Sequence, residues 1–265
     1  MSLDERSPQL DDGRMTLAEH LGELRSRLIK VIIAVVVGAL VAFVFREQIL
    51  DFLLFPLQDD AVDPDTSLLV TDPTETLALA MKLSGYTGIL LAMPVILWQL
   101  WRFIAPGLYD HEKRLAVPGV GSALVLFTMG AALAYWTMPR ALEFLQSIVP
   151  NGDIVYQYSP EKYSMFAVYM MVAFGVGFEF PIILVALQAV DILKPETLSK
   201  GRPYAIVIIF VLVAIITPSG DPISLLALAL PMVVFYEVSI VIGKLIARRR
   251  GRRRAAATAL DTSES

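Results

Sequence analysis

The 265-residue sequence has no cysteine, only two histidines and few charged residues for its length. Without cysteine the chain forms no structural disulfide and has no thiolate nucleophile or metal ligand. Charged residues make up 18% of the chain and hydrophobic residues 56%, whereas the apolar share of soluble domains is nearer ~45–50%. The composition therefore excludes a disulfide-stapled secreted module, a disordered chain and an ordinary soluble domain.

Long apolar segments supply most of this hydrophobicity. A helix needs ~20 residues to cross the ~30 Å hydrocarbon core of a bilayer. Six segments are candidates: Leu28–Phe45, Leu77–Ile104, Leu115–Pro139, Tyr163–Val190, Pro203–Pro218 and Pro222–Gly243. Only Pro203–Pro218 is clearly short. Because a compact polar turn separates it from the last segment, we predict an all-α membrane protein with six spans; four spans and a re-entrant hairpin are the alternative.

The basic residues predict the orientation of these spans. With the N-terminus inside, all but four of the 22 Lys and Arg residues fall on the inner side. The four exceptions are Arg46, Lys82, Arg140 and Lys162. By the positive-inside rule both termini are cytoplasmic. We expect a disordered N-terminus at 1–14, a six-span domain at 15–246 and a basic, then polar, cytoplasmic tail at 247–265.

An amphipathic helix is predicted at 15–27, directly before the first span. Thr16 and Glu19 have capping-box spacing, and leucines recur after them at helical intervals. Such a helix lies on the cytoplasmic surface and leads into the membrane. On its polar face Glu23 is four residues from Arg27. Glu23 is therefore either half of a surface ion pair or a carboxylate available to a cationic ligand.

A second cytoplasmic feature follows the second span. Pro106-Gly107 ends that span, and Glu112 lies near the start of the third, on the same side as Glu23. A carboxylate there is also explained by the dipole at a helix start. His20 and His111 lie on this border too, but two histidines without a third ligand predict no metal site.

Glu179 is the only charged residue between Tyr163 and Val190. It lies roughly 16 Å along the helix from the cytoplasmic end, close to mid-bilayer. A charge at that depth is costly, so Glu179 is protonated, paired or facing a wet cavity.

Prolines in or beside the spans predict kinked, tilted helices around a concavity; they are Pro94, Pro106, Pro118, Pro139, Pro181, Pro203, Pro218 and Pro231.

Five short segments follow one another along the chain: 19–28 (EHLGELRSRL), 103–112, 174–181 (FGVGFEFP), 200–204 and 217–222. Together they resemble the motifs of the TatC family, the core subunits of the twin-arginine protein translocase. Residues 19–28 resemble the family's H-L-x-E-L-R-x-R motif. Residues 103–112 resemble its F-x-x-P-x-L-Y…E signature, and 174–181, FGVGFEFP, its F-G-x-x-F-E-x-P stretch. Residues 200–204 and 217–222 are similar to its later loops. The resemblance covers most of the chain, from Thr16 to Lys244.

The resemblance implies a receptor rather than an enzyme, with no cofactor or metal. It implies that twin-arginine signal peptides of folded proteins bind at the cytoplasmic face, through Glu23, Glu112, Arg25 and Phe103. Glu179 would be the polar residue of the concave face. Further residues would contact partners or support the structure; these are Pro56, Pro94, Pro203 and Asp221.

The resemblance also implies the setting of the protein. It would be a multi-pass protein of the cytoplasmic membrane in an oligomeric complex with small single-span subunits of the TatA and TatB type. Transport of folded proteins would use the proton-motive force, and nucleic acid is not an expected partner. The charge of the Arg-rich tail, and not the resemblance, indicates that the tail contacts anionic lipid.

Three other classes compete with the receptor hypothesis. A proton-coupled secondary transporter using Glu179 needs further polar groups in the spans, and only Lys82, Gln99 and Glu237 are available. An intramembrane protease lacks an intramembrane histidine or a second aspartate. A structural scaffold would not need Glu179.

Overall fold

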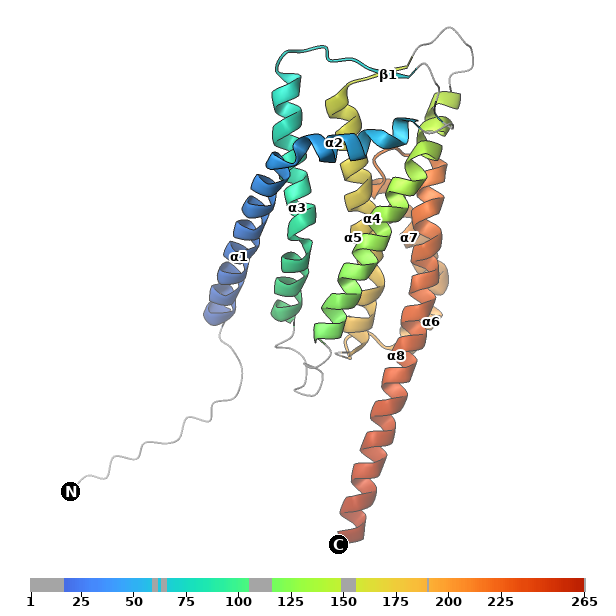
Figure 1. The fold of residues 1–265 in the computed structure, drawn as a ribbon. Helices are drawn as coiled ribbons and strands as arrows, with labels where there is room; N and C mark the ends of the chain where they lie inside the picture. The colour runs from blue at the N-terminus through green and yellow to red at the C-terminus, as the bar shows by residue number, and fades with distance from the viewer. Residues whose placement is uncertain are drawn as a thin grey trace, which may run out of the picture.

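The computed structural model describes residues 17–58, 62, 66–104, 116–148, 156–189 and 191–264 (Figure 1). Glu112 and the predicted disordered segment 1–14 lie outside these residues. The described elements are α1 (Leu17–Val44), α2 (Arg46–Leu54), η1 (Phe55–Gln58), β1 (Ser67–Leu68), α3 (Glu75–Ile104), α4 (Ala116–Ser147), β2 (Gln157–Tyr158), α5 (Pro160–Ala189), α6 (Pro195–Lys200), α7 (Arg202–Ile216) and α8 (Pro222–Glu264). The prediction of an all-helical membrane fold is confirmed.

Five of the described helices are long and apolar enough to cross a membrane: α1, α3, α4, α5 and α8. The segment predicted as a fifth span forms α7, an apolar helix of only 15 residues. At 1.5 Å per residue α7 is roughly 22 Å long, which is shorter than the ~30 Å hydrocarbon core.

Two helices are longer than the sequence predicted. Residues 17–44 form one helix, α1, in place of a separate amphipathic helix and span. No proline interrupts this stretch, and extending an existing helix costs little. Likewise α8 continues from Pro222 to Glu264, although the span was expected to end at Gly243 and a separate tail to begin at residue 247. Arg and Ala are strong helix formers, so α8 extends well beyond the other helices (Figure 1).

The loop expected between the first two spans contains helix α2, which lies across the upright helices (Figure 1). After η1, strand β1 pairs in parallel with β2, with Ser67 opposite Gln157 and Leu68 opposite Tyr158. This pairing brings the connection before α3 to the connection before α5. We call this the strand end of the bundle, and the opposite end, where α1 begins, the tail end.

Helix α5 is at the centre of the bundle and packs against α3, α4 and α8. Its fully buried side chains include Met170 and Phe174. Gly130 of α4 touches the backbone of α5, since a Cβ there would lie 2.5 Å from the Phe174 carbonyl oxygen. Helix α1 packs mainly against α3, with Gly38 beside Gly88. Small residues allow such close approach of membrane helices.

Candidate functional site

Glu23 lies near the start of α1 and pairs with Arg27, one turn further on. Its Oε1 atom accepts hydrogen bonds from the Nε of Arg27, at 3.1 Å, and from the Nη2. The two side chains are only 22% and 12% exposed. The Oε2 atom of Glu23 is buried and has no hydrogen-bond partner among the described residues. Glu23 is thus an ion-pair partner that retains one unsatisfied carboxylate oxygen.

The other residues predicted to bind a signal peptide are described less completely. Arg25 is exposed on α1, two residues after Glu23. Phe103 is the penultimate residue of α3. The end of α3 and the start of α1 both lie at the tail end (Figure 1). Glu112 falls outside the described residues, so its predicted binding of a signal-peptide arginine, together with Glu23, stays a prediction.

Glu179 lies in the central helix, α5, and is half-buried. Its Oε1 atom is buried without a hydrogen-bond partner among the described residues. The helix runs through Pro181 without interruption. On α3, which packs against α5, the Oε1 atom of Gln99 is also buried and unsatisfied within the described part of the chain. Two helices that pack against each other therefore each carry a buried, unsatisfied polar atom among the described residues.

The remaining charged residues that a transporter would need are engaged elsewhere. Lys82 forms an ion pair with Glu161, and Glu237 forms one with Arg202. The first pair joins α3 to the first turn of α5 at the strand end, and the second joins α7 to α8. Neither pair includes Glu179, which disfavours a proton relay through these charges. Sequence reasoning missed both pairings because the partners lie far apart in the chain.

Asp221 has a clear structural role at the turn between α7 and α8. The residue is only 2% exposed. Its carboxylate accepts hydrogen bonds from the Ser224 backbone N–H, at 2.7 Å, and from the Ser219 hydroxyl. Asp221 therefore caps the N-terminus of α8, where a negative charge also complements the helix dipole. Gly220, with φ +60°, provides the left-handed turn before it.

The three prolines predicted as partner-contact or structural residues lie in different settings. Pro56 is buried in η1. Pro94 is inside α3 and exposed. Pro203 is exposed in the first turn of α7, where its fixed φ suits a helix start. Burial explains Pro56 through packing, while the two exposed prolines face the surroundings of the bundle.

No group of three potential metal ligands occurs within the described ranges. The Glu23–Arg27 pair, with its unsatisfied oxygen, lies at the tail end. Carboxylates of this kind bind guanidinium groups through charge-assisted hydrogen bonds.

Comparison with known proteins shows that the sequence is similar to one family over most of its length. The sequence model of the family described as Sec-independent protein translocase protein (TatC) matches residues 19–231. The Sec-independent protein translocase protein TatC of Aquifex aeolicus is 41% identical over 238 residues, which cover 89% of this chain and 98% of that protein. The TatC protein of Frankia casuarinae is 37% identical over 259 residues, covering 94% of this chain and 71% of that one.

Solved structures agree with the sequence relatives. A crystal structure of the twin arginine translocase receptor TatC superposes with a TM-score of 0.72 at 40% identity, covering 86% of this chain and 99% of that chain. A second crystal structure of that receptor, in DDM, gives a TM-score of 0.73 at 41% identity, with coverage of 84% and 99%. The similarity thus extends over nearly the whole length of both receptor chains.

Proposed function

The chain belongs to the TatC family of Sec-independent protein translocase proteins, and from this premise we propose that it is the receptor for twin-arginine signal peptides at the cytoplasmic face. The family consists of components of a protein-transport machinery, not of enzymes. The observation that carries the proposal is the buried, unsatisfied Oε2 atom of Glu23 within the family motif.

The chemistry of recognition follows from the guanidinium group. Its planar fork donates two parallel hydrogen bonds to a carboxylate, which an ammonium group cannot do. One signal-peptide arginine binds Glu23 and the other binds Glu112. Arg27 competes for Glu23 in the resting state, because it already occupies Oε1. The exposed Arg25 donates to carbonyl groups of the peptide, and Phe103 belongs to the last turn of α3 at the same end of the bundle.

The proposed topology has six spans with both termini in the cytoplasm. The tail end carries the basic residues of α1 and α8, as the positive-inside rule requires of a cytoplasmic side. Pairing of β1 with β2 supports placing both of their connections together on the opposite side. The short α7 crosses where the bilayer thins locally. The kinked and tilted helices enclose a concave face that contains Glu179.

Partner subunits bind along α7, next to the exposed Pro203 and the capping residue Asp221. In the described structure α7 packs mainly on α8, and large apolar side chains remain exposed along it, including Tyr204 and Ile215. Single-span subunits of the TatA and TatB type would cover them. The assembled complex in the cytoplasmic membrane then moves folded proteins with the proton-motive force, and Glu179 acts in a step after peptide capture.

Crosslinking of a twin-arginine signal peptide to the protein in native membranes tests the proposal. We expect Glu23→Ala and Glu112→Ala to abolish most crosslinks and Lys-Lys to replace Arg-Arg poorly. Glu179→Ala should retain capture but block transport. Glu47→Ala is the matched control, because Glu47 is an exposed carboxylate of α2 at the other end of α1. Capture that is unchanged in Glu23→Ala and Glu112→Ala would overturn the receptor assignment.

A further inference from the structure

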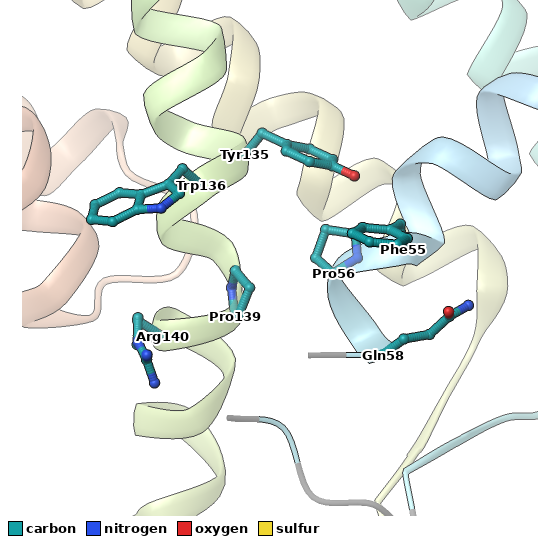
Figure 2. Close-up of a pocket in the computed structure, with 7 residues that line it drawn as sticks. All are labelled: Phe55, Pro56, Gln58, Tyr135, Trp136, Pro139 and Arg140. Carbon is teal, nitrogen blue, oxygen red and sulfur yellow. The ribbon is translucent and has the colours of Figure 1, made fainter. Parts of the chain in front are cut away.

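A notch of about 520 Å³ opens between η1 and α4, far from the peptide site. Figure 2 shows Phe55 and Pro56 across from Tyr135 and Pro139, while Trp136 and Arg140 extend from the other flank of α4. Gln58 completes the lining. We propose that this notch binds the phosphate and glycerol region of one phospholipid, from the leaflet that contains α2.

The walls of the notch are held in a fixed relation to each other. The Tyr135 hydroxyl donates a hydrogen bond to the Phe52 carbonyl oxygen at 2.8 Å. The rings of the same two residues stack with centroids 4.4 Å apart and planes only 5° from parallel. Pro56 is buried beside them. These contacts join the α2–η1 segment to α4, so the notch exists before any ligand binds.

The polar end of the notch suits a phosphate. Arg140 is the cation in its lining, and a guanidinium offers five N–H donors to phosphate oxygens. In the described structure one of these donors bonds to Glu143 at 3.1 Å, with the two side chains 62% and 51% exposed. Because both side chains are largely exposed to solvent, the Arg140–Glu143 ion pair is weak. Glu143 competes with a phosphate for Arg140 but leaves other donors to bind it.

The apolar end continues as a stripe along α4. Val125, Met129 and Trp136 are exposed at spacings of four and seven residues, so they share one helix face with Arg140. Trp136 is 75% exposed. Tryptophan is enriched where membrane hydrocarbon meets the headgroups. Along this face a cation is followed by an indole ring and then by aliphatic side chains, which is the order of polarity within a phospholipid.

The length of the stripe also matches a lipid. Fifteen residues separate Val125 from Arg140, which is roughly 22 Å of helix. One leaflet, including its headgroups, is about 20–22 Å thick, half of a ~40–45 Å bilayer. A soluble anion would use Arg140 alone and leave the stripe unexplained. The occupant is therefore an amphiphile with a phosphate group rather than a free phosphate.

Native mass spectrometry of the purified protein with added dioleoyl phosphatidylglycerol tests the assignment. We expect one tightly bound lipid. Arg140→Gln should weaken its binding about tenfold, the scale of one lost charge-assisted contact, and Trp136→Ala should weaken it by a similar factor through lost apolar contact. Arg46→Gln is the matched control, since Arg46 is an exposed arginine of α2 that does not line the notch. Its lipid affinity should stay within about twofold of the wild type.

A gain-of-affinity variant separates loss of the site from misfolding. Glu143→Gln removes the competing carboxylate and should strengthen lipid binding. Glycerol 3-phosphate, which lacks acyl chains, should not displace the lipid at millimolar concentration. Displacement by glycerol 3-phosphate, or equal lipid affinity in the wild type, Arg140→Gln and Trp136→Ala, would overturn the proposal. Signal-peptide capture involves residues at the tail end, so either result leaves that proposal to its own test.

Discussion

Arg202 and Glu237 form a bidentate ion pair across the hairpin of α7 and α8. The Arg202 Nε lies 2.8 Å from Glu237 Oε1, and its Nη2 donates to Oε2 at 2.8 Å. Arg202 lies fourteen residues from the end of α7 and Glu237 fifteen residues into α8, roughly 21–22 Å from the turn in both cases. The pair therefore fixes the register of the hairpin and explains a carboxylate within the last span.

Arg202→Lys should loosen this hairpin although it conserves the charge. An ammonium group cannot reproduce the two parallel hydrogen bonds of the guanidinium fork. Because the side chains are 45% and 41% exposed, we expect a loss of only about 0.5–1 kcal/mol of unfolding free energy. Thermal unfolding in detergent measures the change. Lys200→Arg, two residues earlier in α6, is the control, and an equal shift there would refute a specific role for the fork.

Arg27→Gln should increase the affinity for a twin-arginine peptide. The substitution frees the Glu23 oxygen that Arg27 occupies in the resting structure. An i,i+4 ion pair is worth about 0.3–0.5 kcal/mol, so the gain is about twofold. Fluorescence anisotropy with a labelled peptide measures it in nanodiscs. A lower affinity in Arg27→Gln would instead make Arg27 part of the binding surface.

Asp221→Ala should destabilise the start of α8. Loss of an N-cap costs about 1 kcal/mol, whereas Asp221→Asn retains an acceptor and should cost much less. The Ser224 backbone N–H donates a hydrogen bond to the Asp221 carboxylate. Amide hydrogen exchange at Ser224 should therefore accelerate in the alanine variant. Equal exchange rates in Asp221→Ala and the wild type would contradict the capping role.

Gly130→Ala should destabilise the contact between α4 and α5. A Cβ at this position would lie 2.5 Å from the Phe174 carbonyl oxygen, so the helices must separate. Overpacking of this kind costs about 1–3 kcal/mol. Gly121→Ala in the same helix is the control, because nothing lies within 4 Å of its Cβ position and alanine favours the helix. Melting temperatures should therefore shift in opposite directions.

The major helices could be predicted from the sequence because a helix that crosses a membrane needs a long, uninterrupted run of apolar residues, which is easy to recognise. Glu179 was identified for the same reason, as one charge in an apolar stretch. The separation of α1 into a surface helix and a span was not seen, because amphipathicity at 15–27 does not require a break in the helix. Helix α2 was missed, since a short helix crossing the bundle is stabilised by tertiary packing, here including the contact of Phe52 with Tyr135.

Pairings distant in sequence were beyond prediction from one sequence. The Glu23–Arg27 pair follows from helical spacing alone and is confirmed. Glu237 was considered only as a polar group for a transporter, because its partner, Arg202, is 35 residues away. The notch at Arg140 is lined by residues of η1 and α4, which are distant in sequence, so it could not be predicted either. The roles of Glu112, Arg25 and Phe103 in binding a signal peptide stay predictions.

A double-mutant cycle between Glu23 and the signal-peptide arginines tests the receptor site most directly. Binding is measured by anisotropy in nanodiscs, for wild type and Glu23→Gln, each with Arg-Arg and Lys-Lys peptides. Because lysine keeps the charge and loses only the paired hydrogen bonds of the guanidinium, a shared contact predicts a coupling free energy of about 0.5–1.5 kcal/mol. Additive effects, with a coupling near zero, would show that Glu23 does not contact the arginines and would contradict the receptor site described above.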